Sequence, residues 1–161
     1  MSENGIPTIL LVDDEEMVLS SIKSFFAIET NYKLMTYTSP LKALEELEVT
    51  HQHVDLVVSD YLMPEMDGIT FLAKVKEQLP MVPRILLTGY ADKENAIKAI
   101  NNVGLYQYIE KPWDNEGLKL VIRNGLEKTT LLNQLAQKIR EAERTQRELN
   151  EVQKDILRVF A

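Results

Sequence analysis

The chain has 161 residues, enough for one domain with a complete hydrophobic core and an extension but too few for two ordinary domains. Its 45% hydrophobic and 27% charged residues are typical of a folded globular protein. The absence of cysteine excludes disulfides and thiolate sites, and the net charge of −7 disfavours direct binding of nucleic acid. No apolar stretch approaches the roughly 20 residues that span a bilayer, and residues 1–5 carry no signal-peptide pattern, so we expect a cytoplasmic protein without a membrane segment.

Four short apolar runs and one segment of alternating residues predict strands, and segments with helical periodicity separate them. The apolar runs are residues 8–12, 56–60, 83–87 and 105–109, and the alternating segment is residues 31–37. Strands that alternate with helices of about ten or more residues form right-handed crossovers. The sequence therefore predicts an α/β fold, with a doubly wound, five-stranded parallel sheet covered on both faces.

Capping signals mark several helix boundaries. Ser39 followed by Pro40 predicts a helix start, Gly104 predicts a helix C-cap, and Asp114 is expected to cap the last helix of the domain. The residues expected to face the core are, helix by helix, Val18, Leu19, Ile22, Phe25, Phe26 and Ile28; Leu41, Leu44 and Leu47; Ile69, Phe71, Leu72 and Val75; Ala96, Ile97 and Ile100; and Leu118, Val121, Ile122 and Leu126.

Polar residues stand at the ends of four predicted strands: Asp13 and Asp14, Asp60, Thr88 and Lys111. Because the carboxyl ends of parallel strands meet at one edge of a sheet, we expect these side chains to converge. Three adjacent carboxylates repel one another unless a cation neutralises them, and oxygen ligands of this kind suit Mg²⁺. The lysine and the hydroxyl can bind an incoming phosphate. The set therefore predicts Mg²⁺-dependent phosphoryl transfer to Asp60, since a carboxylate can accept a phosphoryl group covalently.

Simpler interpretations remain for single residues. An isolated Asp60 is also typical of a turn, and Glu15 and Glu16 would suit the positive end of a helix dipole. His51 and His53 form a His-x-His pair, but no further ligand lies nearby in the sequence, so loop histidines in solvent are favoured over a metal site.

Four motifs make residues 7–126 resemble a receiver domain of a two-component response regulator. They are Leu11-Val12-Asp13-Asp14-Glu15, Ser59-Asp60-Tyr61-Leu62-Met63-Pro64-Glu65-Met66-Asp67-Gly68, Leu87-Thr88-Gly89-Tyr90 and Tyr108-Ile109-Glu110-Lys111-Pro112. The resemblance implies a flavodoxin-like sheet of order 2-1-3-4-5. It also implies a module that a histidine kinase phosphorylates and that controls a partner or downstream output. Such a module is not an enzyme beyond its own phosphorylation and dephosphorylation.

The resemblance also implies a role for each site residue. Asp60 would be the phosphoacceptor. Asp14, Asp60 and the backbone carbonyl of Leu62 would bind Mg²⁺ directly, with Asp13 acting through water. Thr88 and Lys111 would bind the phosphoryl oxygens.

A switch and a backbone feature come with the same resemblance. Tyr108 would turn inward when Thr88 engages the phosphoryl group, although a half-buried strand tyrosine is the simpler interpretation of Tyr108 alone. The Lys111–Pro112 peptide bond is expected to be cis.

Residues 127–161 continue the helical pattern without a proline or glycine stop. An apolar seam with alternating spacings of three and four predicts a coiled coil and a homodimer through this helix. The seam residues are Leu132, Leu135, Ile139, Ala142, Gln146, Leu149, Gln153, Ile156 and Phe160. The two glutamines weaken the seam but can fix its register. A solvated helical linker, with pairs such as Glu143 before Arg147, is the alternative.

Two expectations concern what the chain acts on. No DNA-reading element is present, since a helix-turn-helix output needs about 50 more residues, so we expect an output domain or protein beyond residue 161, such as a signalling enzyme. The rival to a receiver is a Mg²⁺-dependent phosphatase of haloacid-dehalogenase type. Such enzymes carry an acid two residues after the nucleophile, and Leu62 occupies that position.

Overall fold

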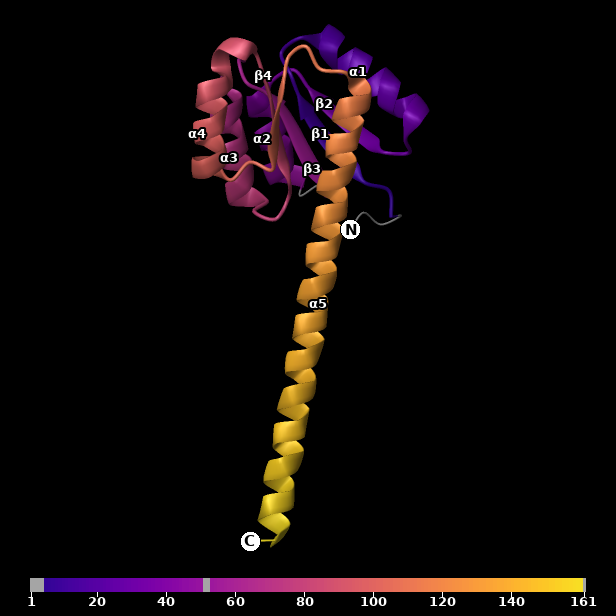
Figure 1. Ribbon diagram of the computed structural model, residues 1–161, viewed down its shortest axis with the longest axis vertical. Coiled ribbons are helices and arrows are strands. Elements are labelled where there is room, and N and C mark those ends of the chain that lie inside the picture. Colours follow the sequence, from indigo (N-terminus) through magenta and orange to yellow (C-terminus); the bar gives the residue numbers. More distant parts are fainter. Residues whose placement is uncertain (1–4, 51–52, 161) are drawn as a thin grey trace. The chain divides into compact units, whose positions relative to one another are not determined.

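The computed structural model describes residues 5–50 and 53–160. Strands and α-helices alternate along the chain (Figure 1). A short 3-10 helix precedes α4. The elements are β1 (Thr8–Val12), α1 (Glu16–Glu29), β2 (Lys33–Tyr37), α2 (Pro40–Thr50), β3 (Leu56–Asp60), α3 (Gly68–Gln78), β4 (Arg84–Thr88), η1 (Tyr90–Asp92), α4 (Lys93–Val103), β5 (Gln107–Glu110) and α5 (Asn115–Phe160).

The strands form one parallel sheet in the order β2-β1-β3-β4-β5. The predicted α/β class and flavodoxin-like order are therefore confirmed. β1, β3 and β4 are buried along their whole length, because they lie inside the sheet and helices cover both faces. The register pairs Val12 with Ser59 and Asp60 with Leu87, so β1, β3 and β4 end at the same edge.

Two apolar clusters cover the two faces of the sheet. One face packs against α2, α3 and α4 through Ala43, Leu47, Phe71, Leu72, Val75, Ala96 and Ala99. The other face packs against α1 and the first part of α5 through Leu19, Ile22, Phe26, Leu118 and Ile122. This arrangement leaves the carboxyl edge of the sheet uncovered by helices, so functional groups can gather there.

Most predicted boundaries are confirmed by cap geometry. α2 begins at Pro40, with the Ser39 hydroxyl accepting from the Lys42 N–H. Gly104 ends α4 in the left-handed conformation, with φ of 69°. Asp114 accepts from the Glu116 N–H at 2.7 Å and caps α5.

The second and fifth strands are shorter than predicted at their starts. β2 begins at Lys33 instead of residue 31, and β5 begins at Gln107 instead of residue 105. The N–H of Tyr106 donates to the Arg84 carbonyl, so the chain reaches β4 only at this residue, two positions after the left-handed Gly104.

Three residues predicted to face the core do not. Ile28 is 82% exposed, Leu41 is 50% exposed and Ile97 is 44% exposed. Each lies about 100–200° around its helix from the buried residues beside it, at about 100° per residue. The small residues Ala43 and Ala99 face the sheet instead, and their size lets the helix backbone come close to it.

The chain divides into two compact units, Met1–Leu126 and Glu127–Ala161, and the division falls within α5. None of the helices in the described part of the chain is long and apolar enough to cross a membrane. Of the His-x-His pair, His51 lies outside the described residues. His53 Nε2 lies 2.8 Å from Asp55 Oδ1, and Asp55 in turn accepts from the Thr8 N–H.

Candidate functional site

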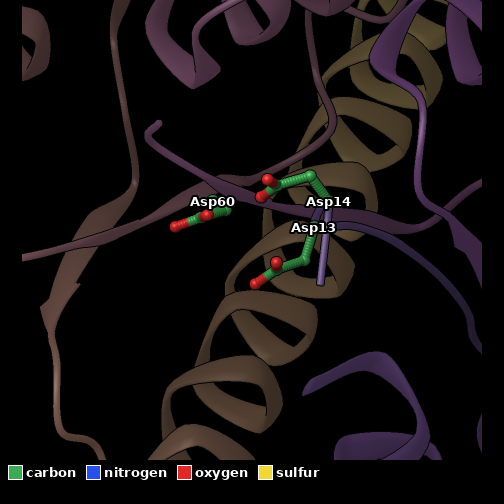
Figure 2. Close-up of side chains that lie close together, drawn as sticks. All are labelled: Asp13, Asp14 and Asp60. Atoms are coloured by element: carbon green, nitrogen blue, oxygen red, sulfur yellow. The ribbon is translucent and has the colours of Figure 1, made fainter. Parts of the chain in front are cut away.

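Three carboxylates meet at the carboxyl edge of the sheet. Asp13 and Asp14 follow β1, and Asp60 is the last residue of β3 (Figure 2). One carboxylate oxygen from each residue lies within 4.8 Å of the others. Asp13 and Asp60 are buried, at 0% and 4% exposure, whereas Asp14 is exposed. Among the described residues, this is the one group of three or more acidic, histidine or cysteine side chains that is close enough to share a metal ion.

Burial makes the ionised form of two of these acids costly. It raises the pKa of Asp13 from 3.8 to about 6, against the opposing effect of the Glu15 N–H, which donates to Asp13 Oδ1 at 2.9 Å. The neighbouring charges of Asp60 and Asp14 raise this pKa further. Burial also raises the pKa of Asp60, although Lys111 opposes the change. The cluster therefore stores unfavourable electrostatic free energy that a cation can relieve.

Lys111 already supplies one positive charge to the cluster. Its Nζ lies 2.8 Å from Asp60 Oδ1. The Asp60 side chain is buried from solvent, and the Lys111 side chain is about one-third exposed. Burial lowers the pKa of Lys111, but the hydrogen bond and charge of Asp60 outweigh burial, so the pKa is raised overall and the ammonium stays protonated. The peptide bond between Lys111 and Pro112 is cis, as expected.

Two buried oxygen atoms at this edge lack a hydrogen-bond partner among the described residues. They are Oδ2 of Asp13 and Oγ1 of Thr88, the last residue of β4. A buried polar atom without a partner is costly unless a ligand satisfies it. Asp13 Oδ2 can accept from a water that surrounds a cation, and the Thr88 hydroxyl can donate to an anion.

The other two predicted residues lie near this edge. Tyr108 is on β5, opposite Leu86 of β4, and its half-buried ring packs against the apolar cluster on the α2, α3 and α4 face. The Leu62 side chain is 62% exposed in the loop after β3.

Two features of the site were missed by reasoning from sequence. A side chain at Gly68 would collide with the Asp60 carbonyl oxygen, so Gly68 lets α3 start directly beside the end of β3. The Trp113 ring lies 5.7 Å from Lys111 Nζ, close enough for a cation–π contact. In the sequence, the available signals were the glycine that ends the motif Ser59–Gly68 and the position of Trp113 two residues after Lys111.

The donor set fits a hard divalent cation. It offers carboxylate oxygens from three residues, one of them solvent-exposed, and a buried oxygen that no donor satisfies. Mg²⁺ prefers one or two carboxylates together with several waters, and an exposed edge provides access for those waters.

The family model described as the response regulator receiver domain matches residues 9–123. The chain belongs to this family. Among solved structures, the receiver resembles the signal receiver domain of an HD domain-containing protein from Pseudomonas fluorescens Pf-5, with 39% identity and a TM-score of 0.71 over 78% of this chain and 98% of that chain. A receiver domain protein from Clostridium thermocellum has 31% identity and a TM-score of 0.73 over 79% and 99% of the two chains.

Curated relatives are longer proteins. The receiver is 33% identical over 120 residues to the hydrogenase transcriptional regulatory protein HoxA of Cupriavidus necator, covering 74% of this chain and 24% of HoxA. It is 33% identical over 123 residues to the regulatory protein AtoC of Escherichia coli, covering 76% and 26%. The receiver therefore spans about a quarter of the length of these relatives. Receiver domains are phosphorylated on aspartate by histidine kinases and are not catalytic enzymes, so these matches favour the receiver over the phosphatase alternative.

Proposed function

We propose that Asp60 is the phosphoacceptor of this receiver and that a histidine kinase supplies the phosphoryl group. A carboxylate oxygen of Asp60 attacks phosphorus, a P–O bond forms, and the P–N bond to the donor imidazole breaks. The observation that carries this proposal is the burial of Asp60 beside two other acids, with Lys111 2.8 Å away. Transfer of this kind depends on positioning and charge neutralisation, and this arrangement provides both.

Mg²⁺ is the proposed cofactor, held by Asp14, Asp60 and the Leu62 carbonyl, with Asp13 acting through water. When bound, Mg²⁺ supplies positive charge that offsets the charge of the incoming phosphoryl group. Asp14 suits direct binding because it is the exposed member of the cluster. Asp13 suits an indirect role because the Glu15 N–H already occupies one of its oxygens.

Thr88, Lys111 and Tyr108 are the proposed response elements. Lys111 and the unpartnered hydroxyl of Thr88 bind phosphoryl oxygens. Movement of Thr88 toward the phosphoryl group frees space at the end of β4, and the half-buried Tyr108 ring turns into it. The resulting change in the surface around β5 would transmit the phosphorylation state of Asp60 to the output domain or partner protein.

Labelling by a small phosphodonor tests the acceptor. Asp60→Asn should abolish uptake of a phosphoryl group from acetyl phosphate in the presence of Mg²⁺, measured by intact-protein mass. Asp67→Asn is the matched control, because it removes a carboxylate outside the cluster and asparagine also caps a helix. Asp14→Asn should instead weaken Mg²⁺ binding in calorimetry. If the Asp60→Asn protein still gains one phosphoryl group, Asp60 is not the acceptor.

The helical unit 127–161 is the proposed dimerisation element. Five side chains of its seam, Leu132, Leu135, Ile139, Leu149 and Ile156, are 44–55% exposed in the single chain. Burying the exposed half of one such side chain would contribute roughly 1 kcal/mol to association. The ten side chains of a dimer would together contribute about 10 kcal/mol. The entropic cost of association is roughly 4–15 kcal/mol, so a reversible dimer is expected.

Sedimentation of the intact chain beside a version that ends at Glu127 tests this element. The intact chain should be dimeric at tens of micromolar, and the shortened chain should be monomeric. A monomeric intact chain, or an equally dimeric short chain, would rule out the helix as the dimerising element.

The proposed setting is the cytoplasm, and the proposed recipient of the signal is an output domain or protein such as a signalling enzyme. The HD domain-containing protein from Pseudomonas fluorescens Pf-5 supports the proposal of an output domain, because it carries an HD domain besides a signal receiver domain that is 39% identical to this one.

A further inference from the structure

The charged residues of the C-terminal helix lie mainly at positions that face away from the apolar seam. In heptad positions lettered a to g, Leu132, Ile139, Gln146, Gln153 and Phe160 occupy position a, and Leu135, Ala142, Leu149 and Ile156 occupy position d. Between residues 131 and 160, Lys138 at g and Glu143 at e are the charged residues that flank the seam. All the other charged residues of this segment fall on the outward positions b, c and f.

The ion pairs of the single helix leave this flanking pair unused. Arg144 pairs with Glu148 at 3.6 Å, and Arg158 pairs with Asp155 at 3.7 Å, all at outward positions. Within residues 5–50 and 53–160, no ion pair involves Lys138 or Glu143.

We infer that the second copy of this chain docks on the helix in parallel and in register. In a parallel pair, a g residue faces the e residue of the following heptad on the other chain. Lys138 of each copy then faces Glu143 of the other, which makes two ion pairs. In an antiparallel pair, g faces g and e faces e. Lys138 would then meet no acid and Glu143 no base, because the other g positions hold Leu131, Thr145, Val152 and Val159, and the other e positions hold Ala136, Asn150 and Leu157.

The two glutamines favour the same orientation. A parallel pair places each a residue opposite its own copy, so Gln146 faces Gln146 and Gln153 faces Gln153. Each amide can then donate to and accept from its counterpart. In every antiparallel register an a residue faces a d residue, so both glutamines would be buried against Leu135, Ala142, Leu149 or Ile156. Gln146 Nε2 already donates to Asn150 Oδ1 at 3.2 Å, so the cost of burying an amide without a partner falls mainly on Gln153.

Two apolar residues outside the seam complete the parallel arrangement. Val152 is 54% exposed and Leu157 is 69% exposed in the single chain. At positions g and e they face each other across a parallel pair and cover the Gln153 layer from water. The arrangement brings the two Glu127 ends together and the two Phe160 ends together.

This inference rests on the proposed homodimer but not on phosphorylation, so its tests use the unphosphorylated full chain. Because the chain has no cysteine, single cysteine variants report orientation directly. Gln146→Cys and Gln153→Cys should form interchain disulfides in a glutathione redox buffer much faster than Arg144→Cys and Glu151→Cys at the outward position f. Gln146→Cys that cross-links no faster than Arg144→Cys, in a chain that sediments as a dimer, would overturn the orientation but leave the dimer standing. A monomeric chain would overturn both.

Charge reversal gives an independent test without cysteine. Lys138→Glu should raise the dimer dissociation constant on the order of tenfold, since both copies lose an attraction and gain a repulsion. The double variant Lys138→Glu/Glu143→Lys should restore the dimer. Arg140→Glu, at the outward position b, is the control and should have little effect. A double variant that dimerises no better than Lys138→Glu alone would overturn the parallel pairing.

Discussion

Removing the charge of Asp13 should stabilise the metal-free protein. The pKa of Asp13 is raised from 3.8 to about 6, mainly by burial. Each pKa unit corresponds to about 1.4 kcal/mol, so the ionised Asp13 carboxylate reduces the free energy of unfolding by about 3 kcal/mol above pH 6. Asp13→Asn keeps an acceptor for the Glu15 N–H and places an amide donor beside Asp60 and Asp14. We therefore expect the free energy of unfolding to rise by up to about 3 kcal/mol at pH 7.5.

The sign of the pH dependence provides a second check on Asp13. Below about pH 4 the carboxyl is protonated in both the folded and the unfolded chain, so it makes no difference there. Between pH 4 and 6 the folded chain holds a proton that the unfolded chain has lost, so wild-type stability falls as pH rises. The difference in free energy of unfolding between Asp13→Asn and the wild type should therefore grow from pH 4 to 6 and level off above pH 6.

Urea unfolding followed by circular dichroism, with EDTA present, measures both effects. Glu45→Gln, which neutralises an exposed acid on α2, is the control for the general charge of −7 and should change stability by less than about 0.5 kcal/mol. Saturating Mg²⁺ should reduce the advantage of Asp13→Asn, because the cation relieves the same repulsion in the wild type. The burial argument would be refuted if Asp13→Asn were no more stable than the wild type at pH 7.5. It would also be refuted if the stability difference were the same at pH 4.

Four further predictions concern single residues. Gly68→Ala should destabilise the fold by about 1–3 kcal/mol in urea unfolding, because the added methyl group collides with the Asp60 carbonyl. Arg84→Met should cost about 2 kcal/mol, because Arg84 is buried and donates to the carbonyls of Val82 and Gly104 at 3.0 and 2.9 Å. Mg²⁺ should change the fluorescence of Trp113, the one tryptophan of the chain, and Lys111→Met should remove this response while calorimetry still detects binding. The phosphorylated protein should lose its phosphoryl group slowly, because Leu62 cannot orient water; a half-life of seconds that Leu62→Asn leaves unchanged would contradict this.

Sequence alone was enough to place the site at one edge of the sheet. Parallel strands joined by right-handed crossovers all end on the same side, so Asp13, Asp60 and Thr88 could be brought together by counting strands. Lys111 followed from the same rule one residue beyond β5. Local signals were equally sufficient for Gly104, since a helix C-cap depends on its own backbone angles.

The three-dimensional packing decided the properties that depend on distant neighbours. Ile28, Leu41 and Ile97 share the helical periodicity of the core residues. The face of each helix that contacts the sheet is narrower than its apolar face, however, so all three residues stay exposed. The raised pKa of Asp13 arises from burial by the assembled domain, which no local pattern encodes. The close approach of Gly68 to Asp60 likewise exists only once α3 has packed beside β3, because it joins backbone atoms that the extended chain keeps apart.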